Sequence, residues 1–111
     1  MTKSSFATSP DSIRMSVNER RTLSFDTAPD LLPSADTAPS AIVATLVTTN
    51  DDALPVSVAI PPTVRGTSVL QVIDGLADNL VVYTVYRLRI QFTALPSNNK
   101  FVMDLELDVW P

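Results

Sequence analysis

A strict alternation of apolar and polar residues in two neighbouring segments constrains this sequence most. Large apolar side chains occupy every even position of residues 86–92 and every odd position of residues 101–109. A repeat of two residues is typical of a β-strand with one buried face and one solvated face. Residues 96–100 between the two segments are turn-forming (Pro-Ser-Asn-Asn-Lys). The two segments are therefore predicted to form an antiparallel hairpin.

The register of this hairpin is predicted from its two faces. We expect apolar residues to face one another on the buried side, and arginines to face acids on the solvated side. The expected pairs are Phe92 with Met103, Ile90 with Leu105, Leu88 with Leu107, Tyr86 with Val109, Arg89 with Glu106 and Arg87 with Asp108. A shift by one residue would bury two arginines, whereas a shift by two leaves each arginine opposite an acid. Leu88, Ile90, Leu105 and Leu107 are expected at the centre of the core.

The rest of the sequence indicates an all-β domain. Short β-rich segments at residues 20–25, 42–49, 56–60 and 67–73 are separated by prolines and by Asn/Asp turns, with a Gly turn at residues 74–75. The intervening residues 26–40 are expected to form a covering loop that tucks Leu31 and Leu32 against the core. Six or seven strands in about 90 residues favour an antiparallel β-sandwich of immunoglobulin-like type. A jelly roll or a small barrel is the alternative. Tyr83 or Tyr86 is a candidate for the tyrosine corner that clamps a loop in such sandwiches.

Residues 1–19 are predicted to be an extended N-terminal arm, and residues 20–111 a single sandwich domain. The segment is rich in Ser and Thr and contains the apolar residues Phe6, Ile13, Met15 and Val17. Ordering a terminal segment costs about 1–2 kcal/mol of backbone entropy per residue, so we expect the arm to order only against a neighbouring subunit. Those four residues are its candidate subunit contacts.

Composition excludes several kinds of active site. The chain has no Cys and no His, which excludes thiolate metal sites, histidine ligands and Ser-His-Asp triads. Its two glycines form no phosphate-binding motif. The acidic row Asp104, Glu106 and Asp108 is interpreted as a solvated strand face opposite arginines, because calcium requires more oxygen ligands than this row supplies. We therefore expect no enzyme activity, catalytic residue, metal or cofactor.

Charge and hydropathy bear on partners and location. The net charge of −4 disfavours nucleic acid and acidic membranes as partners. No apolar run reaches the ~20 residues of a membrane span, and the first residues lack the apolar core of a signal peptide. Synthesis in the cytoplasm is expected.

The order of segments resembles a known family. Residues 20–26 (Arg-Arg-Thr-Leu-Ser-Phe-Asp) lead through a Pro/Ala/Ser/Asp-rich connection into a strand at 42–49. A strand at 67–73, a glycine turn, a Tyr-led strand at 86–92 and a final strand at 101–109 follow. This layout resembles the small structural proteins of tailed bacteriophages that serve as fibre–tail adaptors or neck proteins and have an immunoglobulin-like fold.

The resemblance implies a virion component without a cofactor. Such a protein would be made in the host cytoplasm, form homo-oligomers and bind other virion proteins, namely portal, adaptor, capsid, tail or fibre subunits. Its place would be an adaptor at the neck, tail or fibre attachment site, or a decoration (cement) protein on the capsid. The alternative is an immunoglobulin-like adhesin or a carbohydrate-binding module.

Overall fold

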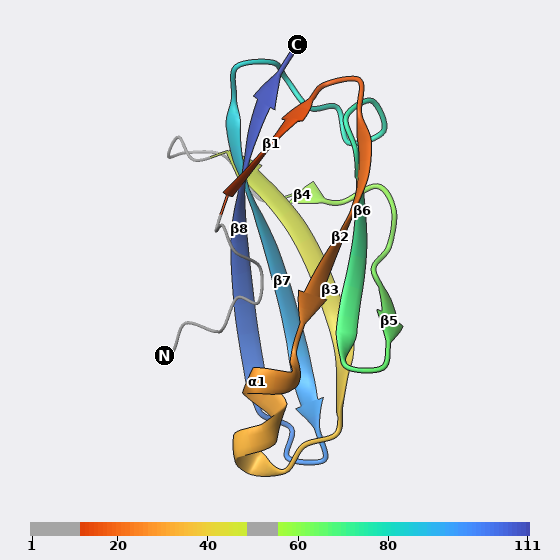
Figure 1. Ribbon diagram of the computed structural model, residues 1–111, viewed down its shortest axis with the longest axis vertical. Coiled ribbons are helices and arrows are strands. Elements are labelled where there is room, and N and C mark those ends of the chain that lie inside the picture. The colour runs from red at the N-terminus through yellow and green to blue at the C-terminus, as the bar shows by residue number, and fades with distance from the viewer. Residues whose placement is uncertain (1–11, 49–55) are drawn as a thin grey trace.

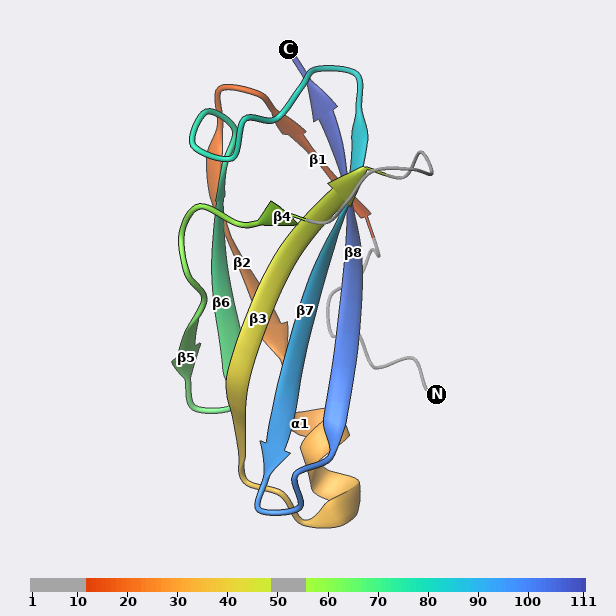
Figure 2. The same cartoon turned by 180° about the vertical axis from the view of Figure 1, so that it is seen from behind.

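Two β-sheets packed face to face build the fold in the computed structural model, which describes residues 12–48 and 56–111 (Figures 1 and 2). The five-stranded sheet has the order β1-β8-β7-β3-β4 and the three-stranded sheet the order β2-β6-β5. The strands are β1 (Ser12–Ser16), β2 (Arg20–Asp26), β3 (Ala38–Thr48), β4 (Val56–Ser57), β5 (Thr63–Arg65), β6 (Ser68–Asp74), β7 (Val85–Leu95) and β8 (Lys100–Trp110). The predicted all-β sandwich is confirmed.

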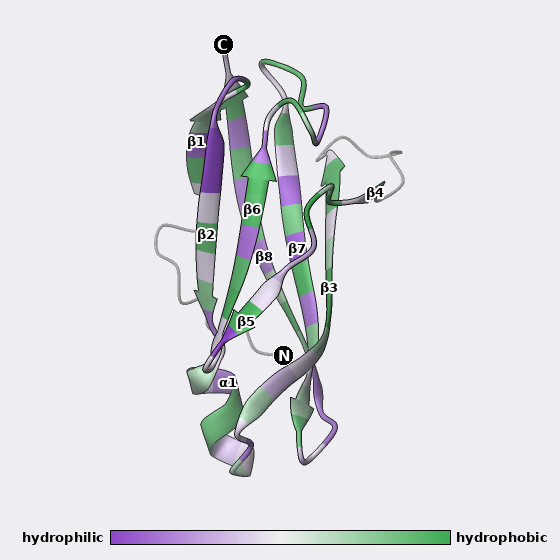
Figure 3. Ribbon diagram, turned by 90° about the vertical axis from the view of Figure 1, so that its right-hand side faces the viewer, coloured by the Kyte–Doolittle hydropathy of each residue, from purple (hydrophilic) through white to green (hydrophobic). Residues whose placement is uncertain are grey.

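The core lies between the sheets and follows the predicted alternation. Hydropathy changes from residue to residue along β7 and β8 (Figure 3). Leu88, Ile90, Leu105 and Leu107 are almost completely buried, which confirms their predicted place at the centre. Gln71 on β6 is also fully buried, and its side-chain amide donates to the carbonyl groups of Ile60 and Val72.

The hairpin of β7 and β8 is antiparallel as predicted, but its predicted register is wrong by two residues. Leu88 lies opposite Leu105, and Arg89 lies opposite Asp104. The turn causes the difference. The Asn98 N–H donates to the Ala94 carbonyl, and the Ala94 N–H donates to the Asn99 carbonyl, both at 2.7 Å. This close turn fixes a register that buries the same apolar faces as the predicted one.

The predicted N-terminal arm is wrong for residues 12–19. Ser12–Ser16 form strand β1, which pairs in parallel with β8 at the edge of the larger sheet. Met15 is 1% exposed, and Ile13 and Val17 pack against the core. Burial beside β8 repays the entropy of ordering this segment within the same chain, so no second subunit is needed for it. Phe6 lies outside the described residues.

The connection between β2 and β3 also differs from the prediction. It contains a short helix, α1 (Ala28–Leu31), and one 3-10 turn, η1 (Leu32–Ser34). Leu31 is buried as expected, but Leu32 is 72% exposed. Strand β3 begins at Ala38, earlier than predicted, and contains a bulge between Ser40 and Val43. Of the predicted strand at 56–60, only Val56–Ser57 form a strand, β4. The Asn/Asp turn predicted before it, at residues 50–52, lies outside the described residues.

Two contacts, made by Tyr86 and Gly75, fix the loop between β6 and β7. The Tyr86 hydroxyl accepts a hydrogen bond from the Val81 N–H at 2.9 Å, so Tyr86 is the tyrosine that clamps the loop. Gly75 lies in the predicted Gly turn at residues 74–75, and the space around it explains why it is glycine. A Cβ at Gly75 would overlap the backbone carbonyl of Val17, and the Gly75 N–H donates to the Glu19 carbonyl. Glycine is required there because the β1–β2 turn passes directly over it.

Candidate interaction surface

Two aromatic rings and an arginine gather at one end of the sandwich. Trp110 ends β8, Tyr83 lies in the loop before β7, and Arg14 is on β1; β8 ends beside this loop near the point marked C in Figure 1. The Tyr83 and Trp110 rings meet edge to face, with centroids 5.4 Å apart. The Arg14 guanidinium lies 4.5 Å from the centroid of the Trp110 ring. Tyr83 is 68% exposed and Trp110 38% exposed. We call this end of the sandwich the aromatic end.

The backbone holds Tyr83 in an unusual conformation. Its φ is 62°, in the left-handed region that few residues other than glycine adopt. The Tyr83 N–H donates to the Val109 carbonyl at 2.7 Å, and the Val109 N–H donates to the Thr84 carbonyl at 3.0 Å. A strained residue persists only where its surroundings impose the strain, and such residues concentrate at functional sites. These hydrogen bonds hold the Tyr83 backbone against β8, beside Trp110.

Two more apolar side chains are exposed on the same loop. Leu76 is 69% exposed and Val81 is 58% exposed. Together with Tyr83 and Trp110 they give this end four large apolar side chains in contact with solvent. Tyr83 and Trp110 are in contact with each other, and adjoining exposed apolar groups mark binding surfaces more often than scattered ones do. The aromatic end is therefore the best candidate for a docking site among the described residues.

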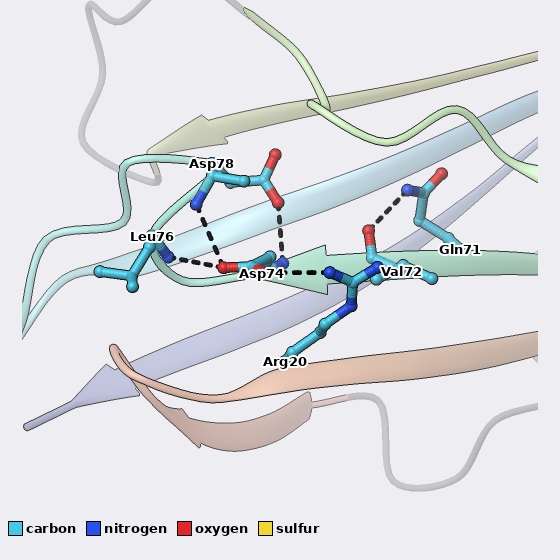
Figure 4. Close-up of polar contacts among 7 residues, drawn as sticks. Arg20, Gln71, Val72, Asp74, Leu76 and Asp78 are labelled. Carbon is cyan, nitrogen blue, oxygen red and sulfur yellow. Dashed lines mark hydrogen bonds and ion pairs between the residues drawn. The ribbon is translucent and has the colours of Figure 1, made fainter.

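The start of this loop is fixed by two carboxylates (Figure 4). Asp74 accepts hydrogen bonds from the N–H groups of Ala77 and Leu76, and Asp78 accepts one from the Asp74 N–H. The Ala77 and Leu76 N–H groups lower the pKa of Asp74 below its ordinary value, and the Arg20 guanidinium at 3.6 Å lowers it further. These contacts give the exposed Leu76 a defined position.

Two of the three acids in the row on β8 contact arginines. Asp104 accepts two hydrogen bonds from Arg89, at 2.9 and 3.1 Å, and this pairing raises the pKa of Arg89. Asp108 lies 3.9 Å from Arg14. Within residues 12–48 and 56–111, no group of three His, Cys, Asp or Glu residues is placed to hold a metal ion. The row is the outward face of a strand, as the alternation predicted.

The predicted contact residues and the aromatic end do not coincide. Met15 faces the core, Ile13 and Val17 pack on it, and Phe6 is not described. Arg14, Tyr83 and Trp110 were not predicted as contact residues. Trp110 carried a usable signal, because its even position in the β8 alternation places it on the outward face. Arg14 carried none, because it meets Trp110 only through the pairing of β1 with β8.

A shallow groove marks the outward face of the larger sheet, near the turn between β7 and β8. Its volume is about 390 Å³, and its lining includes Val43, Gln91, Phe101 and Val102. Val43 is 49% exposed and Val102 38% exposed. The groove extends the apolar surface of this face away from the aromatic end.

Comparisons with known proteins give this chain no relative. In the described part of the chain, none of the helices has the length and apolar character needed to cross a membrane. No family model, no curated protein and no solved structure matches the chain.

Proposed function

We propose that this chain is a non-enzymatic structural protein of a tailed-bacteriophage particle, with an immunoglobulin-like fold. It acts as an adaptor at the neck, tail or fibre attachment site, or as a decoration protein on the capsid. Its partners are other virion proteins, and it is incorporated into the virion after synthesis in the host cytoplasm. The observation that carries the proposal is the exposure of Tyr83 and Trp110 beside Arg14 at one end of the sandwich.

The strand order supports the immunoglobulin-like part of the proposal. The orders β2-β6-β5 and β8-β7-β3-β4 correspond to B-E-D and G-F-C-C′ in that fold. Tyr86 lies near the start of β7, and its hydroxyl bonds back to Val81, as a tyrosine corner does. Leu88, two residues further on, occupies the position at which antibody domains have their second core cysteine.

The composition of the aromatic end supports a protein partner. Trp, Tyr and Arg are the residues that contribute most often to the energetic centre of protein interfaces. Tyr83 and Trp110 already pack against each other, so binding would cost little additional side-chain entropy.

An adhesin or carbohydrate-binding module is the second candidate. Exposed Tyr and Trp rings also stack on sugar rings, which favours this alternative. However, the Arg14 guanidinium covers part of the Trp110 ring, and the Tyr83 ring packs edge to face against it. Both contacts reduce the ring area on which a sugar would stack, so the structure favours the protein partner.

The test is incorporation into particles. A tagged chain, produced while particles form from the genome that encodes it, should co-sediment with them. The double variant Tyr83→Ala/Trp110→Ala should fold but be absent from the particles. Leu32→Ala is the control, since Leu32 is about as exposed as Tyr83 but lies in η1, outside the aromatic end. Normal incorporation of the double variant, or absence of the wild-type chain from particles, would contradict the proposal. Binding of the wild-type chain to purified polysaccharides, lost in the double variant, would support the alternative.

A further inference from the structure

We infer that the outward face of the five-stranded sheet binds a second copy of this chain, through reciprocal ion pairs between Arg87 of one copy and Glu106 of the other. This surface is formed by the outward side chains of β3, β7 and β8. The inference goes beyond the proposed function and does not depend on it, because it concerns only the free protein and a different surface.

The charges on this face are separated by strand. The outward residues Asp104, Glu106 and Asp108 make the centre of β8 acidic, whereas Arg87 and Arg89 make the neighbouring part of β7 basic. Within one copy, Arg87 lies opposite Glu106, and Arg89 lies opposite Asp104. The face therefore presents an acidic strip directly beside a shorter basic strip.

One cross-strand pair of opposite charges on this face, Arg87 and Glu106, forms no ion pair among the described residues. Arg89 holds Asp104 with two hydrogen bonds, and Arg14 lies within ion-pair distance of Asp108. Glu106 is exposed and Arg87 is half-buried, so both are accessible to a partner. Arg87 is the third residue of β7, and Glu106 is the seventh residue of β8.

This pattern is complementary to itself under one two-fold axis. An axis parallel to the strands, between β7 and β8, places β8 of each copy over β7 of the other. Glu106 of each copy then meets Arg87 of the other, and the contact occurs twice, as in any isologous interface. An axis perpendicular to the strands would place Glu106 over Asp104 of the second copy, and like charges would oppose the contact. The charges thus select a second copy and its orientation.

The size and apolar content of the face indicate a weak dimer. Strands β7 and β8 have 11 residues each, so at about 3.3 Å per residue the face is roughly 35 Å long. Three such strands span only about 10–15 Å in width. Val43 and Val102 add exposed apolar area beside the shallow groove. Interfaces at the small end of the range are transient, so we expect a dissociation constant of about micromolar order or weaker.

Charge reversal tests the inference with the full chain. The single variants Arg87→Glu and Glu106→Arg each place like charges at both reciprocal contacts. Sedimentation equilibrium should show that each raises the dimer dissociation constant by about 10- to 100-fold. An equimolar mixture of the two variants should dimerise again, since every contact in the mixed dimer joins opposite charges. The double variant Arg87→Glu/Glu106→Arg should dimerise like the wild-type chain.

Arg65→Glu is the matched control, because Arg65 is exposed on β5 of the other sheet. It should leave the dimer unchanged, and melting temperatures should show that all variants fold. A wild-type chain that stays monomeric up to millimolar concentration would overturn the inference. So would single variants that dimerise as tightly as the wild type, or a mixture that does not recover. None of these results would affect incorporation into particles through Tyr83 and Trp110, so the two proposals fail separately.

Discussion

The two ends of the sandwich are closed in different ways. At the end that carries α1, Leu31 is buried and Asp36 accepts hydrogen bonds from the Ser97 N–H and hydroxyl groups at 2.9 and 2.7 Å. The Thr27 hydroxyl donates to the Thr67 carbonyl at 2.6 Å. The aromatic end has comparable carboxylate contacts around Asp74, but it leaves Tyr83 and Trp110 in solvent. The α1 end buries Leu31 under its own helix, whereas the aromatic end leaves two aromatic rings exposed.

The difference shows which end is free to bind. Thr27 and Asp36 are 0% and 5% exposed, so the α1 end has already buried the groups that close its loops. Leu32 and Leu95 are exposed at this end, but the loops around them are already held by buried polar contacts. At the aromatic end the polar contacts lie at the base of the loop, and the apolar side chains lie outside it. A partner can therefore bury these apolar side chains without breaking the polar contacts.

The largest expected effect is a loss of stability from a substitution at the aromatic end. Gly75→Ala should destabilise the protein by about 5 kcal/mol or more, because the new methyl group would overlap the Val17 backbone, which cannot move without displacing β1. Chemical denaturation measures the loss. Gly66→Ala is the control: a Cβ there contacts nothing, and only the positive φ of 62° makes it costly, by about 1 kcal/mol. Equal effects at the two glycines would contradict the close contact between the β1–β2 turn and the β6–β7 loop.

A smaller effect should follow from opening the α1 end. Leu31→Ala should cost about 3 kcal/mol, because Leu31 is 1% exposed and its removal leaves a cavity under α1. Leu32→Ala, on a side chain that is 72% exposed, should change stability by less than about 0.5 kcal/mol. Thermal unfolding of both variants would measure this contrast. Similar losses at the two positions would mean that α1 does not cover this end as described.

The smallest expected effect is on the pH dependence of stability, through Asp74 at the aromatic end. Because hydrogen bonds from Ala77 and Leu76 lower the pKa of folded Asp74 below its ordinary value of 3.8, its carboxylate stabilises the fold above that pH. This contribution is lost as the pH falls through the lower folded pKa. Asp74→Asn should therefore show a shallower fall in melting temperature below about pH 4 than the wild type does. Glu106→Gln removes one negative charge from the sheet face and serves as the control. An unchanged acid profile in Asp74→Asn would contradict this role.

Local sequence pattern predicted most of the sandwich and left its pairing choices open. The alternation at Leu88 and Leu105 identified two strands and their buried faces. It could not separate two registers that differ by two residues, because Arg89 meets an acid in both. The backbone hydrogen bonds between Ala94 and the turn decided between them, and nothing in the alternation encodes those bonds.

The N-terminal strand and the aromatic end were harder to predict for the same reason. Ile13, Met15 and Val17 do alternate, but three apolar residues beside a terminus also suit a mobile segment. What decides the outcome is the open edge of β8, which is distant in the sequence. The contact of Arg14 with Trp110 depends on that pairing as well, so it cannot be anticipated from either segment alone.

The parallel pairing of β1 with β8 has a consequence for how the chain folds. It joins residue 12 to residue 106, so this edge of the larger sheet cannot form until β8 has been synthesised. Contacts of such high sequence separation slow folding, because their loop-closure entropy is lost before any stabilisation is gained. The pairing partner of Met15 on β8 is therefore absent during the synthesis of the residues between them. The hairpin of β7 and β8 is the local structure best suited to form first, and β1 is suited to dock on it last.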